Sequence, residues 1–324
     1  MREFVIVDNE SGQRFDKYLF KLLKNAGTGL IFKQLRCKNI TLNKAKAKGN
    51  EILHSGDVVR IFMSDDTIDK FMGSNTRQDA KPVVLPHSVF TVVYEDENII
   101  IADKPAGVLS QKSKPDDYSM NEMLLDYLRE SGQDEIITHT FTPAFCNRLD
   151  RNTSGLMVGG KSLAGLQKMS EIIKDRTIHK YYLAIVVGNV PKQGKVSGYL
   201  YKDNAHNKVV VSDCQMPDSS FIDTEYEPLE HKDGLTLLKV KLITGKTHQI
   251  RAHLASIGYP ILGDVKYADV HSAEFGRRLK VKYQLLHSYE LVMPELSGRF
   301  ENISGMKICS EYPKNFKRFF DVRK

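Results

Sequence analysis

The sequence has few cysteines and no long apolar run, and both absences narrow the class of protein. Its four cysteines, Cys37, Cys146, Cys214 and Cys309, are scattered and form no Cys-x-x-Cys pair. Neither a disulfide framework nor a zinc site is therefore expected. No uninterrupted apolar stretch approaches the roughly 20 residues that cross a bilayer, and the N-terminus lacks the apolar core of a signal peptide. We expect a cytoplasmic protein that does not associate with membranes.

Cofactor and metal signatures are also missing. No Gly-rich phosphate-binding loop occurs in the sequence. His248 and His253 are five residues apart and would point in different directions on a helix, and the other histidines show no metal-ligand spacing. Cys146 lies near a candidate carboxylate, but a free cysteine more often fills a small buried space. We predict that the protein needs neither a metal nor a cofactor.

Positive charge is concentrated near the N-terminus of this 324-residue chain, whose length favours two domains. Residues 1–63 contain twelve Lys and Arg against six Asp and Glu, whereas the whole chain has a net charge of +7. No acidic residue occurs between Lys17 and Lys48. Such a segment is typical of a surface that binds a phosphate backbone, although a solvated face is the alternative interpretation.

The N-terminal pattern predicts a small α/β domain over residues 1–63. Phe15, Leu19 and Leu22 recur at helical spacing, and a second short helix is expected over 33–38, followed by short strands. The polar composition that follows predicts a linker over 64–85, which would let the domain move. The side chains predicted to bind RNA here are Lys17, Lys21, Lys33, Arg36, Lys38, Lys44 and Lys46.

Residues 86–324 predict an α+β domain with a mixed, mainly antiparallel sheet. Strands are expected over residues 90–94, 99–102, 181–187, 224–229 and 236–243. Helices are expected over residues 121–130, after a cap at Ser162, and over 247–257. Their apolar faces are most simply explained as core.

Three segments of this domain contain residues suited to chemistry. In 147–155, Asp150 lies between Arg148 and Arg151 in a turn-forming segment, where a carboxylate would stay ionised and positioned to attack a sugar carbon. A solvated loop aspartate is the alternative. The second segment places Tyr182 on a β-rich run, and the third places Arg251 near the apolar side of a helix, where it needs a carboxylate partner.

In this order the three segments resemble the motifs of RNA pseudouridine synthases of the ribosomal large-subunit type. The resemblance spans about residues 89–295 and includes Lys104-Pro105-Ala106-Gly107. One departure is Asn147, where the family usually has a histidine, which argues against proton transfer at that position. About residues 12–63 resemble the αL RNA-binding domain shared with a small-subunit ribosomal protein, although Lys44 stands where a turn glycine is expected.

The resemblance implies an isomerase that converts specific uridines to pseudouridine in RNA, with large-subunit ribosomal RNA as the expected substrate and partner. Asp150 would act at the ribose by covalent attack or proton abstraction, Arg251 would keep it ionised, and Tyr182 would pack on the target base. Arg148 would fill the space left by the extruded base, hold a phosphate, or form a structural ion pair. The alternatives are a synthase acting on transfer RNA, a non-catalytic ribosome assembly factor, and hydrolysis of the base–sugar bond.

Overall fold

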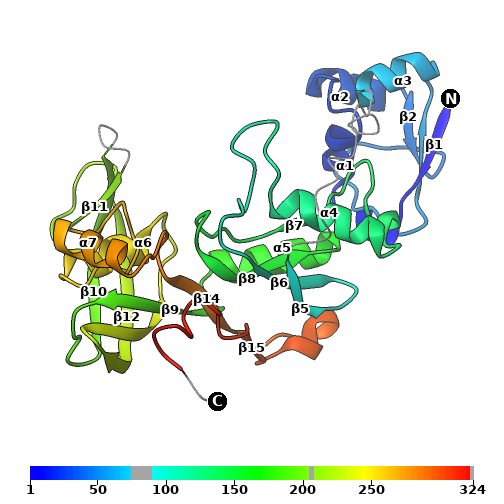
Figure 1. The fold of residues 1–324 in the computed structure, drawn as a ribbon. Coiled ribbons are helices and arrows are strands. Elements are labelled where there is room, and N and C mark those ends of the chain that lie inside the picture. Colours follow the sequence, from blue (N-terminus) through cyan, green and yellow to red (C-terminus); the bar gives the residue numbers. More distant parts are fainter. Residues whose placement is uncertain (74–89, 204–207, 322–324) are drawn as a thin grey trace.

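The computed structural model describes residues 1–73, 90–203 and 208–321. These residues form a small N-terminal part with a four-stranded sheet and a larger part with an eleven-stranded sheet. Figure 1 shows the N-terminal part above the helices α4 (Met120–Glu130) and α5 (Leu163–Lys174) of the larger part. The α+β class and the mixed sheet predicted from the sequence are confirmed.

The N-terminal part packs two helices against a sheet in the strand order β1-β4-β2-β3. Its first helix buries Phe15, Leu19 and Leu22, as predicted. The prediction for the second helix is wrong, because this helix begins at Thr28 and ends at Arg36. The elements are β1 (Arg2–Val5), η1 (Asp8–Glu10), α1 (Phe15–Leu22), α2 (Thr28–Arg36), β2 (Ile40–Leu42), β3 (Ala45–Lys46), β4 (Val58–Ile61) and α3 (Asp65–Met72).

Local chemistry explains where α2 lies and how the following hairpin turns. Ile31 and Leu35, four residues apart, are the buried side chains of α2. Lys38, two residues after the end of the helix, has a left-handed backbone with a φ of 58°. Asn43 and Lys44 have φ values of 49° and 66° between β2 and β3. Two successive left-handed residues are the backbone of a tight hairpin turn, so the lysine adopts the conformation expected of the missing glycine.

The segment predicted as a linker begins with helix α3. Ser64 caps this helix by accepting a hydrogen bond from the Thr67 amide at 3.4 Å, and Ile68 is fully buried in the N-terminal core. The first part of that segment is therefore ordered structure rather than linker. The remaining residues, 74–85, lie outside the described part of the chain, and the domain boundaries stay a prediction.

The N-terminal part contacts the larger part through η1. Asn9 Nδ2 donates a hydrogen bond to the Ile136 carbonyl at 3.4 Å, and Thr140 Oγ1 donates one to the Glu10 carboxylate. Glu10 is only 5% exposed, so a carboxylate is buried at this contact. The contacted residues 136–140 lie a few positions before the segment that contains Asp150.

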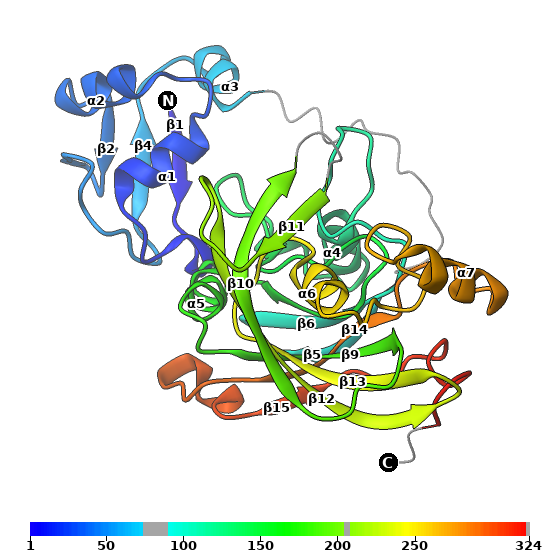
Figure 2. The ribbon, with the colours of Figure 1, turned by 90° about the vertical axis from the view of Figure 1, so that its left-hand side faces the viewer.

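The larger sheet has the strand order β11-β10-β12-β13-β9-β14-β8-β6-β5, with β15 and β7 paired at its sides. Every pair is antiparallel except β14 with β8. Figure 2 shows α6 (Gln249–Ser256) lying against this sheet beside β10 and β11. The strands are β5 (Thr91–Glu95), β6 (Ile99–Lys104), β7 (Ala144–Phe145), β8 (Ser154–Gly160), β9 (His179–Val187), β10 (Gly194–Asp203), β11 (Lys208–Ser212), β12 (Ser220–Lys232), β13 (Leu235–Leu242), β14 (Leu286–Val292) and β15 (Lys307–Cys309).

Predicted strands and helices of this part are confirmed with boundary shifts of a few residues. Ser162 caps α5 by accepting from the Gly165 amide at 2.9 Å. The β10–β11 hairpin, α7 (Val270–Arg278), β15 and the short helices η2 (Asp134–Ile136) and η3 (Gly298–Ile303) were not predicted. Among the described residues, no helix combines the length and apolarity needed to cross a bilayer.

The parallel pair at the centre of the sheet requires a glycine. Gly155 pairs with Ser288 and has a φ of 109°, and a Cβ atom added to it would lie 2.2 Å from the Ser288 carbonyl oxygen. No other residue type fits this approach without moving the backbone. The loop that precedes β8 is thereby held close against β14.

Candidate active site

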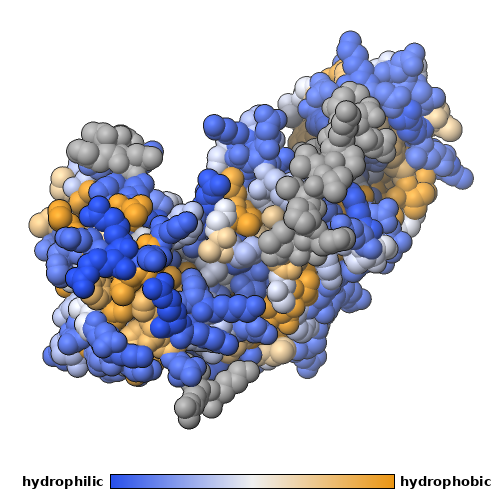
Figure 3. Space-filling view, viewed as in Figure 1, coloured by the Kyte–Doolittle hydropathy of each residue, from blue (hydrophilic) through white to orange (hydrophobic). Residues whose placement is uncertain are grey.

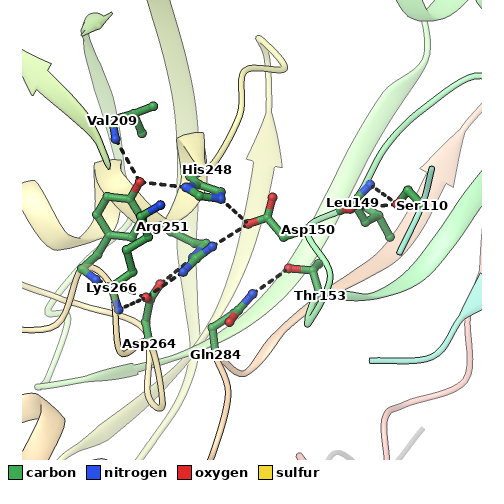
Figure 4. A network of polar contacts seen from close by, with 11 residues as sticks. Ser110, Leu149, Asp150, Thr153, Val209, His248, Arg251, Asp264, Lys266 and Gln284 are labelled. Atoms are coloured by element: carbon green, nitrogen blue, oxygen red, sulfur yellow. Dashed lines mark hydrogen bonds and ion pairs between the residues drawn. The ribbon is translucent and has the colours of Figure 1, made fainter. Parts of the chain in front are cut away.

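Asp150 and Arg251 meet in three dimensions although they are far apart in sequence. Asp150 lies in the loop before β8, and Arg251 lies on α6. Arg251 Nη1 donates a hydrogen bond to Asp150 Oδ2 at 2.8 Å (Figure 4). The other edge of the guanidinium donates to Asp264, from Nε at 2.6 Å and from Nη2 at 2.9 Å. One arginine therefore joins two carboxylates, and the predicted pairing with Asp150 is present.

Burial makes this arrangement rigid. The Arg251 and Asp264 side chains are 8% and 0% exposed, whereas the Asp150 side chain is 22% exposed. Burial alone lowers the pKa of Arg251, but the hydrogen bonds and charges of Asp264 and then of Asp150 raise it above its usual value. Asp264 therefore anchors the guanidinium, and the anchored cation binds Asp150, the more accessible carboxylate.

The loop around Asp150 is fixed by hydrogen bonds to its backbone. Ser110 Oγ accepts from the Leu149 amide at 3.0 Å and donates to the Leu149 carbonyl at 2.8 Å. The Asp150 carbonyl accepts from the Thr153 amide at 3.0 Å, which closes a turn. The Thr153 hydroxyl accepts from Gln284 at 3.3 Å. The carboxylate is thus presented on a loop that several elements hold in place.

A buried lysine also fixes the loop that contains Asp150, through hydrogen bonds to backbone carbonyls. Lys104 is fully buried, and its Nζ donates to the carbonyls of Pro105 at 2.9 Å, Val108 at 2.8 Å and Arg151 at 2.9 Å. Three carbonyl acceptors match the three donors of an ammonium group. Burial lowers the pKa of Lys104 to about 7, although the charges of Asp150 and Asp103 oppose this shift. The sequence motif indicated this segment without assigning the lysine a role.

A histidine and a tyrosine complete the polar network. His248 Nε2 lies 3.8 Å from Asp150 Oδ2, and its Nδ1 lies 2.8 Å from the Tyr267 hydroxyl, which accepts from the Val209 amide at 3.2 Å. Burial, followed by the positive charges of Arg251 and Lys266, lowers the pKa of His248, and the Asp150 charge opposes this. The histidine ring is therefore neutral near neutral pH.

Tyr182 lies on β9 and is 6% exposed, in the core cluster that includes Leu149 and Ile250. Burial raises its pKa to about 12, and the nearby Asp150 charge contributes in the same direction. The tyrosine is therefore protonated at neutral pH and lies close enough to Asp150 to sense its charge. It packs beneath the site rather than standing half-exposed on a strand.

The arginines that flank Asp150 in sequence are not its partners. Arg151 Nε donates to the Gly107 carbonyl at 3.0 Å. Arg148 is exposed and forms no ion pair within residues 1–73, 90–203 and 208–321. Arg148 thus has no ion-pair partner in the described part of the chain, and its role stays a prediction.

Asn147 has a structural contact at the position where a histidine is usual in the resembled family. Its Oδ1 accepts a hydrogen bond from the Val158 amide at 2.8 Å, so the amide side chain is bound to β8. The neighbouring Cys146 is largely covered and contacts the Leu166 carbonyl, and burial raises the pKa of its thiol. Both residues support the loop and neither faces Asp150.

The seven basic side chains predicted to bind RNA in the N-terminal part are all exposed, and none forms an ion pair among the described residues. Other arginines there are paired, such as Arg14 with Asp16 at 2.7 Å and Arg60 with Glu3. Hydrophilic residues cover most of this part on the face shown in Figure 3. Lys21 differs from the others, because its Nζ donates to the buried Gln13 at 3.1 Å and burial lowers its pKa. The other six cations lie on the exposed surface.

A separate hollow lies on the larger sheet, away from Asp150 and Arg251. It is lined by Tyr181, Lys239, Lys241 and Glu225 among others. Because successive side chains of a strand point to opposite faces, Tyr181 and Tyr182 lie on different sides of β9. The hollow is thus not part of the Asp150 site. No group of three or more potential metal ligands occurs in the described part of the chain.

Known proteins with this fold and sequence place the chain in a class. A sequence profile described as RNA pseudouridylate synthase matches residues 98–256. The solved structure of Human RNA Pseudouridylate Synthase Domain Containing 4 superimposes with a TM-score of 0.57 at 21% identity, covering 72% of this chain and 94% of that chain. The structure of Human RNA Pseudouridylate Synthase Domain Containing 1 gives a TM-score of 0.55 at 21% identity, covering 70% and 84%. The fold is that of the RNA pseudouridylate synthases.

Curated relatives agree over most of their length. An uncharacterized RNA pseudouridine synthase of Mycoplasma genitalium is 32% identical over 91% of this chain and 90% of its own. Ribosomal large subunit pseudouridine synthase D of Borreliella burgdorferi is 30% identical over 98% of this chain and 91% of its own. The chain belongs to the RNA pseudouridine synthase family and is therefore an isomerase, as the sequence motifs predicted.

Proposed function

We propose that this protein converts uridines of large-subunit ribosomal RNA to pseudouridine, with Asp150 as the nucleophile. Ribosomal large subunit synthases named C and D are among its relatives, with identities of 27–30% over 85% or more of this chain, which supports this substrate over transfer RNA. The proposal rests on one observation. The Asp150 carboxylate lies on a fixed loop, and the buried Arg251 binds it at 2.8 Å.

In the proposed reaction an oxygen of Asp150 attacks C1′ of the ribose, a carbon–oxygen bond forms, and the bond from C1′ to uracil N1 breaks. The uracil leaves with the electron pair of that bond, turns, and forms a new bond from C5 to C1′ as Asp150 departs. The C5 proton is lost to solvent and N1 gains a proton. No electron is gained or lost overall, so the reaction needs no redox partner.

Other side chains have defined parts in this proposal. Arg251 attracts and orients the Asp150 carboxylate, because two unit charges about 4 Å apart attract by roughly 4 kcal/mol at an effective dielectric of about 20, before desolvation. Tyr182 packs beneath the target base, and the exposed Arg148 fills the space that the extruded uridine leaves. The N-terminal part, an αL-like RNA-binding domain joined by a linker, contacts the phosphate backbone through its seven exposed cations.

The proposal is tested with RNA carrying tritium at uracil C5, since replacing this hydrogen releases the label. We expect release from large-subunit ribosomal RNA and little release from transfer RNA. The Asp150→Asn variant should release no label yet bind RNA with unchanged affinity. Binding without release by the unaltered protein would favour an assembly factor, and free uracil with an abasic site would indicate hydrolysis.

The nucleophilic role has its own test. Deuterium placed at ribose C2′ should leave the single-turnover rate nearly unchanged, because attack at C1′ does not break that bond. A large primary isotope effect would instead show that Asp150 abstracts the C2′ proton. Mapping pseudouridines in cellular RNA with and without the protein would then identify the modified positions.

A further inference from the structure

His248 occupies an unusual position in the Asp150 network. It is the residue that precedes α6, with a left-handed backbone at φ 56°, and it lies three residues before Arg251. Non-glycine residues adopt this conformation infrequently, and such residues cluster at functional sites. The backbone conformation alone assigns no role, but it directs attention to what the ring contacts.

The contacts of the ring define which nitrogen carries its hydrogen. Nε2 faces a carboxylate, which can only accept, so the hydrogen of the neutral ring belongs on Nε2. Nδ1 is then an acceptor, and the Tyr267 hydroxyl at 2.8 Å donates to it. The same hydroxyl oxygen accepts from the Val209 amide of β11. Figure 4 shows Val209, His248 and Asp150 along this chain of contacts.

Both donor groups near Asp150 approach the same carboxylate oxygen, Oδ2. Arg251 Nη1 is 2.8 Å from Oδ2, and His248 Nε2 is 3.8 Å from the same Oδ2. Oδ1 has no hydrogen-bond partner within the described residues. The carboxylate is thus held at one oxygen and leaves the other available for reaction.

We propose that His248 is a positioning residue for Asp150: its neutral ring, oriented by Tyr267, directs an N–H group at Oδ2 and so presents Oδ1 to the substrate. This role rests on the proposed function of Asp150. The distance of 3.8 Å is longer than a hydrogen bond, so the N–H group acts on Oδ2 as a directed dipole and leaves the hydrogen bond from Arg251 in place.

The state of the ring explains why Tyr267 matters. A protonated His248 would form a full ion pair with Asp150 and compete with the attack on the substrate. Burial and the charges of Arg251 and Lys266 favour the neutral ring, while the charges of Asp150 and Asp264 favour the protonated one. The donation from Tyr267 to Nδ1 also favours the neutral form. Removing that donation should therefore raise the pKa of His248.

The test measures the single-turnover rate of tritium release between about pH 5.5 and 8.5. We expect His248→Ala to lower the rate about tenfold, or about 1.4 kcal/mol in activation free energy, with unchanged RNA affinity. His248→Gln, whose amide nitrogen can take the place of Nε2, should recover most of that loss. Tyr267→Phe should lose activity on the acid side, and the double variant His248→Gln with Tyr267→Phe should not.

Controls separate this inference from the proposed function. His271→Gln, which changes an exposed histidine on α7, should behave as the unaltered protein. An active Asp150→Asn variant would overturn the proposed function and this inference together. With Asp150→Asn inactive, the inference alone fails if glutamine at 248 is as impaired as alanine, or if the pH profile of Tyr267→Phe matches that of the unaltered protein. Thermal unfolding of each variant checks that it is folded. If His248→Ala does not fold, the pH profile of Tyr267→Phe still tests the inference.

Discussion

The seven predicted RNA-binding cations of the N-terminal part and the Arg251 guanidinium of the larger part lie in opposite environments. The seven predicted RNA-binding cations of the N-terminal part are exposed and unpaired among the described residues, whereas Arg251 is buried between two carboxylates. Exposed charges attract a polyanion at long range and are screened by salt, while a buried pair is insensitive to salt and fixes geometry. Binding and chemistry should therefore respond to different perturbations.

The largest effect is expected from removing the buried cation. Arg251→Met leaves the buried Asp264 carboxylate with backbone amide donors but without its cation. Losing that cation costs about 3–5 kcal/mol of stability and removes the charge that holds Asp150. Denaturant unfolding should show the loss of stability, and tritium release should be abolished. The exposed Arg277→Met on α7 is the matched control and should change neither. A stable and active Arg251→Met protein would contradict the role given to this pair.

Acid should distinguish the two parts next. In the larger part, burial lowers the pKa of His287 and of His253 to about 4. The single histidine in residues 1–73, His54, is exposed. Between about pH 6.5 and 4 the unfolded chain binds more protons than the folded one, so stability falls as pH falls, by up to about 1.4 kcal/mol per unit for each histidine. Hydrogen exchange at pH 5 should show the larger part opening more readily than at pH 7. His287→Gln should weaken this dependence, and equal acid sensitivity of both parts would contradict it.

Salt dependence should respond to the N-terminal cations. Neutralising Lys33, Arg36 and Lys38 to glutamine should lower the slope of log affinity against log salt by roughly 0.7–0.9 for each lost phosphate contact. The single-turnover rate at saturating RNA should stay unchanged. Lys168→Gln, which removes a cation paired with Glu171 on α5, is the control for charge alone. An unchanged slope in the triple variant would mean that these residues do not contact RNA.

The smallest effect is expected at the contact between the two parts. Thr140→Val removes the hydroxyl that donates to the buried Glu10 and should cost about 1–3 kcal/mol at that contact. Limited proteolysis after residue 73 should become faster, while thermal unfolding of the larger part and RNA affinity change little. Thr142→Val, which changes an exposed threonine two residues away, is the matched control. Unaltered proteolysis would show that the parts are held together by other contacts.

The sequence predicted the enzyme family and the contact between Asp150 and Arg251 better than it predicted the residues around them. Asp150, Tyr182 and Arg251 could be identified because each lies in a short motif, and the need of Arg251 for a carboxylate follows from its apolar surroundings. Asp264 lies only 13 residues after Arg251, yet its bidentate contact depends on how that segment folds back onto α6. The contacts of His248 with Tyr267 and of Lys104 with three carbonyls join distant segments, which local patterns do not encode.

Missed elements have similar physical causes. Helix α3 is eight residues long and buries essentially one side chain, Ile68, so its polar composition resembled a linker. The start of α2 depends on Ile31 packing into the N-terminal core, which overrides the basic cluster that suggested a later helix. Tertiary packing decided both elements, and propensity alone did not.

The central parallel pair has a consequence for how the enzyme forms. Ser154 and Gly155 align with His287 and Ser288, which lie 133 residues further along the chain. Pairings of such long separation close late and slowly, since a large loop must lose its freedom first. Catalytic competence should therefore return at the end of refolding, after local helices and hairpins have formed. The return of tritium release during refolding would therefore report when the whole sheet has formed.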